Sequence, residues 1–107
     1  MILLLTIPAL SRPAPILAGG VYSISSGKSG KFSVAKVLVV EDGAVHVCLY
    51  SNEFPKRPSK VDPKQLKVAI GHVPLAEQGF RNWQPVLLYK VPIREADLEG
   101  YRMWKRH

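Results

Sequence analysis

The chain has 107 residues, of which 47% are hydrophobic and 21% are charged, and this near-average composition argues against extensive disorder. That length is enough for one domain with a single core. The only cysteine, Cys48, excludes an internal disulfide and a zinc site built from several cysteines, and it predicts a reducing, cytoplasmic location.

The net charge of +7 is concentrated in the second half of the chain. Residues 1–53 carry four Lys/Arg against three Asp/Glu, whereas residues 54–107 carry eleven against five. This asymmetry is compatible with an acidic partner, which could be nucleic acid, anionic lipid or protein. A solvated basic face would explain the same distribution without any partner.

The chain begins with an apolar segment that is interrupted early. Pro8 falls after seven residues, well short of the roughly 20 that a membrane-spanning helix needs. No basic residue precedes the apolar run, although a signal peptide has one there. We therefore predict that residues 1–18 are an extended, proline-containing arm, and that residues 19–107 are one β-rich domain.

Strand-like alternation follows this arm. Residues 21–25, 31–41 and 44–50 alternate or are rich in β-branched side chains, which predicts three strands. In the third, Val45, Val47 and Leu49 should face one side, with His46, Cys48 and Tyr50 on the other. Asp42 and Gly43 between the second and third strands predict a tight hairpin turn.

The second half is expected to contain a loop, two more strands and two helices. Residues 51–65 predict a long exposed loop, residues 66–70 and 85–91 strands, and residues 73–83 a short helix. Residues 92–107 predict a final helix that docks through Tyr101 and Trp104, and Trp83 and Trp104 are expected to be core anchors.

These elements predict an α+β, β-rich fold with a C-terminal helix. The body is expected to be a small, strongly bent antiparallel sheet or an SH3-like barrel of about five strands. We rank the barrel first, and an open five-stranded sheet covered by the helix second.

The letters GKS at Gly27, Lys28 and Ser29 resemble part of a phosphate-binding loop. Such a loop needs a glycine five positions before Gly27, where this chain has Tyr22, and it must lead into a helix. The Val-rich segment that follows favours a strand. We therefore interpret Gly27–Gly30 as a hairpin bend.

Other catalytic and metal-binding patterns are weak. His46 and Cys48 lie two apart on one strand face, but a zinc site needs three or four ligands. We interpret Cys48 as a small buried hydrophobic residue and His46 as a surface or capped strand residue. No serine lies in a G-x-S-x-G motif, so the sequence predicts a protein that is not an enzyme and has no cofactor and no metal.

The proline-rich loop is the strongest candidate for a binding surface. Basic residues between positions 56 and 67 lie close to two aromatic residues, a combination found in protein interfaces and in nucleic-acid sites. The candidate contact residues are Tyr50, Phe54, Lys56, Arg57 and Lys60. The alternative is that the aromatic rings pin the loop to the core and the lysines are only solvated.

The segment GGVYSISSGKSGKFSVAKVL, residues 19–38, resembles the opening of small bacterial SH3-like barrel domains. Some of these are grouped with immunity proteins of polymorphic-toxin systems, and many are uncharacterised. The resemblance implies a non-catalytic module that binds a protein partner, although the strongly basic second half departs from that group. A nucleic-acid-binding barrel that uses residues 56–67 is the alternative.

Overall fold

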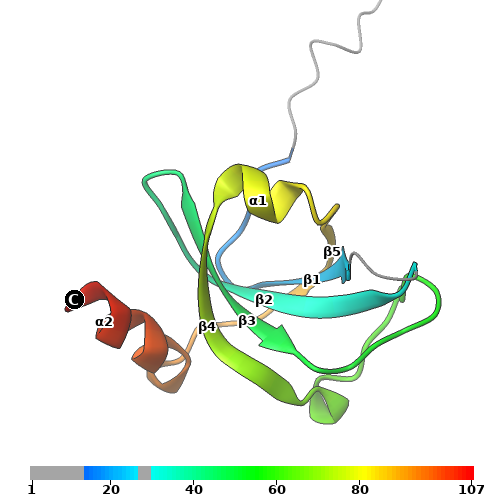
Figure 1. Ribbon diagram of the computed structural model, residues 1–107. Helices are drawn as coiled ribbons and strands as arrows, with labels where there is room; N and C mark the ends of the chain where they lie inside the picture. Colours follow the sequence, from blue (N-terminus) through cyan, green and yellow to red (C-terminus); the bar gives the residue numbers. More distant parts are fainter. Residues whose placement is uncertain (1–13, 27–29) are drawn as a thin grey trace, which may run out of the picture.

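The computed structural model describes residues 14–26 and 30–107, and its body is a five-stranded antiparallel sheet in the order β4-β3-β2-β1-β5. The strands are β1 Gly20–Ser25, β2 Phe32–Glu41, β3 Ala44–Tyr50, β4 Val68–Ala76 and β5 Val86–Lys90. The sheet is strongly bent but remains open, because its edge strands β4 and β5 do not pair (Figure 1). The predicted β-rich α+β fold is confirmed, and the closed barrel that we ranked first is wrong.

The β2–β3 hairpin turns where the sequence predicts it. Asp42 and Gly43 have φ angles of 49° and 76°, and Glu41 pairs with Ala44 across the turn. Two consecutive positive φ angles are typical of the type I′ turn that Asp-Gly favours. The local sequence therefore fixes this turn.

The GKS motif lies between two paired strands. Ser25 of β1 pairs with Phe32 of β2, so the chain reverses direction between them. Gly27, Lys28 and Ser29 themselves lie outside the described residues. The segment that follows the motif is β2 rather than a helix, as the Val-rich sequence predicts.

One face of the sheet carries the apolar core. Tyr22 and Ile24 of β1 pack there with alternate residues of β2 and β3, and helix α1, Glu77–Arg81, adds Phe80. Phe80 is fully buried, and its ring meets that of Tyr22 edge-on, with 5.5 Å between the centroids. Trp83 also packs against this cluster, so its predicted role as a core anchor is confirmed.

Strand β4 is longer than the sequence suggests, and helix α1 is shorter. The helix predicted over residues 73–83 begins only at Glu77, because Val73 and Leu75 pair with β3. Pro74 lies within β4, where it lacks an N–H to donate. An edge strand tolerates this loss, and β4 is an edge.

The other face of the sheet is covered as well. The loop between β3 and β4, which contains the short 3-10 helix η2, Pro63–Gln65, covers one end. The other end is covered by an 11-residue helical segment made of η3, Glu95–Leu98, and α2, Glu99–Lys105 (Figure 1). Among the described residues, no helix has the length and apolar character to cross a membrane.

Helix α2 docks on β3 and β4 through aromatic rings. The Tyr101 and Trp104 rings lie 4.8 and 4.7 Å from that of His46, which confirms the predicted docking. Trp104 remains 45% exposed, however, so its predicted role as a core anchor is wrong. Gly100 allows the close approach, because a Cβ atom there would lie 2.8 Å from the Cβ of His72.

Candidate functional site

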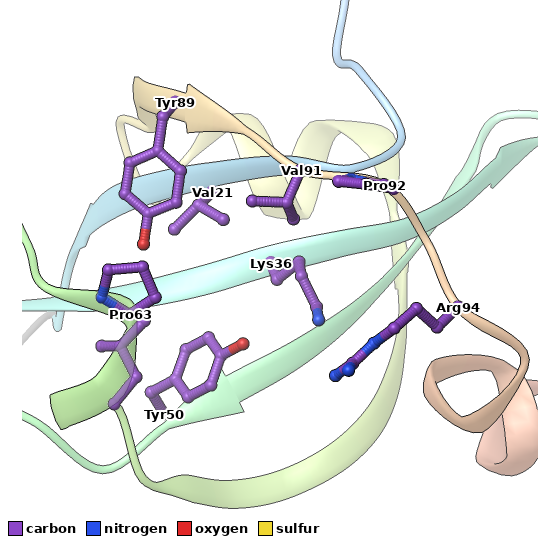
Figure 2. A pocket seen from close by; sticks show the side chains of 9 residues that line it. Val21, Lys36, Tyr50, Pro63, Tyr89, Val91, Pro92 and Arg94 are labelled. Carbon is purple, nitrogen blue, oxygen red and sulfur yellow. The ribbon is translucent and has the colours of Figure 1, made fainter.

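A cavity of about 360 Å³ lies on the face of the sheet opposite the apolar core, between the sheet, the β3–β4 loop and the segment after β5 (Figure 2). We call this the polar face, because it carries Ser23, Lys36 and His46. Its walls are largely apolar and include Val21, Leu66 and Val91. Four polar side chains also line it: Lys36, Tyr50, Tyr89 and Arg94. An apolar cavity with a few convergent polar groups is the usual form of a small-ligand site.

Strand register explains why these side chains meet. Val21 of β1 pairs with Lys36 of β2 on one side and with Tyr89 of β5 on the other. Lys36 also pairs with Cys48 of β3, and Tyr50 follows two residues later on the same face. Paired residues point to the same side of a sheet, so three strands aim Lys36, Tyr50 and Tyr89 into one space (Figure 2).

A buried ion pair fixes the charged end of the cavity. The Lys36 Nζ lies 3.2 Å from the Asp97 Oδ1, and the two side chains are 12% and 14% exposed. Asp97 also accepts a 2.9 Å hydrogen bond from the Arg94 backbone N–H. Burial raises the pKa of Asp97, but this hydrogen bond and Lys36 outweigh it, so the pKa is lowered and the carboxylate is charged.

The two phenols of the cavity are hydrogen-bond donors at neutral pH. Burial raises the pKa of Tyr50 and of Tyr89, and Asp62 raises that of Tyr89 further, so both hydroxyls keep their protons. The Tyr89 hydroxyl is buried and has no partner among the described residues.

The five residues predicted to bind a partner do not form one surface. Tyr50 is half-buried and faces the cavity, whereas Phe54 forms two backbone hydrogen bonds with Phe32, of 2.9 and 2.8 Å. Lys56 and Lys60 are exposed. Their role in binding stays a prediction.

Arg57 points inward and holds the loop to the sheet. Its Nη1 donates hydrogen bonds of 3.1 and 2.7 Å to the backbone oxygen and the Oγ of Ser23, which is fully buried. Its guanidinium carbon lies 4.7 Å from the centroid of the Phe32 ring. These contacts give Arg57 a structural task that the sequence pattern did not reveal.

Side chains also order the far end of the loop. Asn52 donates to the Gln65 carbonyl and accepts from the Lys67 N–H, each at 2.9 Å. Asp62 accepts a 2.9 Å hydrogen bond from the Lys64 N–H and caps η2. The predicted long loop is therefore held in place at both ends.

Sequence reasoning missed three of the four polar side chains in the cavity, namely Lys36, Tyr89 and Arg94. Lys36 offered a signal, because it is a charge within the Val-rich segment of β2 and alternates with buried positions. Such a charge needs a partner when it is buried. Tyr89 and Arg94 offered none, since only the sheet order brings them to β1 and β2.

The polar face also contains a pair of histidines that the sequence did not connect. His46 Nδ1 and His72 Nε2 lie 2.9 Å apart, and the rings stack with centroids 5.1 Å apart. His46 is fully buried, so the prediction of a surface or capped residue is wrong. Within residues 14–26 and 30–107, no group of three or more His, Cys, Asp or Glu side chains could hold a metal ion.

Cys48 lies on the same face of β3 and is 6% exposed, which confirms the prediction of a small buried residue. Burial raises the pKa of its thiol. The thiolate, which is the nucleophilic form, is therefore disfavoured at neutral pH.

No protein-family model, curated protein or solved structure matches this chain. The resemblance of residues 19–38 to small bacterial barrel domains stays a prediction.

Proposed function

We propose that this protein is a non-catalytic binding module that contacts an acidic protein partner through the outer side of the β3–β4 loop. The observation that carries the proposal is that Lys56 and Lys60 are exposed on a loop that Arg57 and Phe54 fasten to the sheet. An immunity-type inhibitor, which blocks a toxin by occlusion, is one form of such a module. The single buried thiol, Cys48, supports a reducing, cytoplasmic setting.

Preorganisation of the loop supports this proposal. Binding normally costs roughly 0.5–1.5 kcal/mol for each flexible side chain that becomes ordered, and ordering a loop adds to this cost. Here Arg57, Asn52 and Asp62 hold the loop through hydrogen bonds before any partner arrives. The exposed lysines can then steer an acidic surface toward the loop.

Nucleic acid is the alternative partner, and the placement of the aromatic rings favours protein over it. Stacking of bases needs exposed ring faces beside the basic groups. Tyr50 instead lines the cavity, and the guanidinium of Arg57 lies over the Phe32 ring beside Phe54. Neither predicted aromatic residue is fully exposed.

Charge reversal at the loop tests the proposal. We expect Lys56→Glu combined with Lys60→Glu to reduce recovery of cross-linked protein partners from the native host about tenfold, as quantitative mass spectrometry would measure. Arg57 is left unchanged because it holds the loop. The matched control is Lys90→Glu with Arg106→Glu, two exposed residues outside the loop whose reversal changes the net charge equally.

Two outcomes would contradict this proposal. In one, both double variants lose or keep the same partners, so the loop makes no specific contribution. In the other, the unmodified protein binds a labelled DNA duplex with an affinity that falls steeply with salt, at a slope near 0.9 per neutralised phosphate. That second result would favour the nucleic-acid alternative.

A further inference from the structure

The cavity on the polar face has the size and shape of a site for a small molecule or a single side chain. Its volume of about 360 Å³ lies near the lower end of the range of roughly 300–1,000 Å³ for ligand sites. The apolar walls from Val21, Leu66 and Val91 favour a compact apolar group over water.

At the end of the cavity near Lys36, the charges favour one anionic group. Lys36 and Arg94 each carry a positive charge and Asp97, which pairs with both, carries one negative charge, so these three residues sum to +1. Asp62 is a further negative charge, near Tyr89. A carboxylate, with a charge of −1, balances this excess, whereas a phosphate group near −2 exceeds it. Arg94 lines the cavity, and its 79% exposed side chain pairs with Asp97, whose Oδ2 lies 3.8 Å from the Arg94 Nε.

An unused hydrogen-bond donor points to the same chemistry. The Tyr89 side chain lines the cavity, and its buried hydroxyl has no partner within residues 14–26 and 30–107, which is costly unless a ligand or water accepts from it. Lys36 and Tyr50 aim polar atoms into the same space (Figure 2). A carboxylate offers two acceptor oxygens and could satisfy Tyr89 and one cation together.

We propose that the cavity binds a monocarboxylate with a compact apolar body. The carboxylate lies between Lys36, Arg94 and the Tyr89 hydroxyl, and the apolar body packs against Val21 and Val91. Both a free small acid and the last residue of a peptide present this chemistry. This proposal is independent of the earlier one, in which Lys56 and Lys60 contact a protein partner.

Titration followed by NMR tests this proposal with the full chain. The probes are 3-phenylpropanoate and 4-methylpentanoate, with 3-phenylpropanamide as the neutral match and inorganic phosphate as the rival anion. We expect the carboxylates to shift the amide signals of Lys36, Tyr50 and Tyr89 at millimolar concentrations or below. The amide and phosphate should bind about tenfold more weakly, because neither matches the charge.

Two substitutions locate the contact. Tyr89→Phe removes only the unpartnered hydroxyl, and Arg94→Gln removes the cation at the mouth, so each should weaken 3-phenylpropanoate binding about fivefold or more. Arg102→Gln is the matched control, because Arg102 pairs with Glu95 outside the cavity. Thermal unfolding checks that each variant is folded. Lys56→Glu with Lys60→Glu should leave this binding unchanged.

A tetrapeptide that ends in phenylalanine distinguishes the two sources. Tighter binding of this peptide than of 3-phenylpropanoate assigns the cavity to a chain terminus, and absence of peptide binding assigns it to a free acid. Equal binding of acid and amide would overturn the proposal. So would unchanged affinity in both Tyr89→Phe and Arg94→Gln, or no signal shift from either carboxylate at millimolar concentration.

Discussion

The two faces of the sheet are built from the same strands but differ in chemistry. The face under α1 carries the apolar core cluster, in which Phe80 is fully buried. The opposite face buries Ser23, Lys36 and His46 under the loop and α2, and it retains a cavity. One face is therefore covered by apolar side chains, and the other also buries polar groups.

Because of this difference, the two faces contribute to the stability of the fold in different ways. Burial of apolar surface stabilises the fold in proportion to its area. Burial of a polar group costs free energy unless a partner compensates, and on the polar face Arg57 and Asp97 serve as such partners. Both of our binding proposals concern the polar face and the loop that covers it.

The largest loss of stability should come from removing a buried ring from the apolar core. We expect Phe80→Ala to lower the free energy of unfolding by about 3–5 kcal/mol, because it removes a fully buried ring and leaves a cavity. Urea denaturation would measure the loss. The control is Phe54→Ala in the loop, where the ring is only half-buried and the cost should be clearly smaller. Equal costs would break the contrast between the two faces.

The next effect concerns pH and the histidines of the polar face. Burial lowers the pKa of His46 and of His72. For His46, Glu41 opposes this effect and Lys105 adds to it. At acidic pH the unfolded chain therefore binds more protons than the folded protein does. The free energy of unfolding should fall as the pH drops below about 6.5. We expect a smaller loss than for Phe80→Ala, because the two histidines lie outside the apolar core cluster.

Denaturation at about pH 7.5 and about pH 5.5, on either side of the ordinary histidine pKa, would measure this loss. Glu41, whose pKa is lowered by its hydrogen bonds with Tyr101 and Lys105, should add a further loss only below its ordinary value of 4.5. His72→Gln should reduce the dependence between the two pH values, whereas His107→Gln at the exposed end of the chain should not. If His72→Gln leaves the pH dependence of the free energy of unfolding unchanged, that dependence does not come from the two histidines.

The smallest effects should come from two helical glycines, and they should have opposite signs. At Gly79 in α1 an added Cβ meets nothing within 4 Å, so Gly79→Ala should stabilise the protein by about 0.5–1 kcal/mol. At Gly100 in α2 the Cβ would lie 2.8 Å from His72, so Gly100→Ala should destabilise it by about 1 kcal/mol. Thermal unfolding would show shifts of about 4 °C in opposite directions. Shifts of the same sign would show that α2 is not tightly docked.

Prediction from the sequence succeeded where the signal was local. The Asp42-Gly43 turn and the alternation of Val45 and Val47 follow from backbone preferences and a period of two, and both are observed. The end of β4 could not be predicted in this way. Val73 to Ala76 are compatible with a helix start, and only pairing with β3 holds them extended.

The candidate site was less predictable than the fold, for a related reason. Arg57 looked like a free basic residue in a proline-rich loop, but its partner, Ser23, is 34 positions away. His46 looked like a surface residue until α2 and His72 covered it. Neither contact can be inferred from the residues next to Arg57 or His46 in the sequence.

The sequence by itself determined the first three strands, the hairpin turn and the late helix, because φ/ψ preferences and side-chain periodicity act over a few residues. The tertiary structure decided that the sheet stays open and that its second face is covered. It also decided that Lys36, Tyr89 and Arg94 meet in one cavity. These outcomes depend on contacts between distant segments, which are selected by the free energy of the whole packed chain.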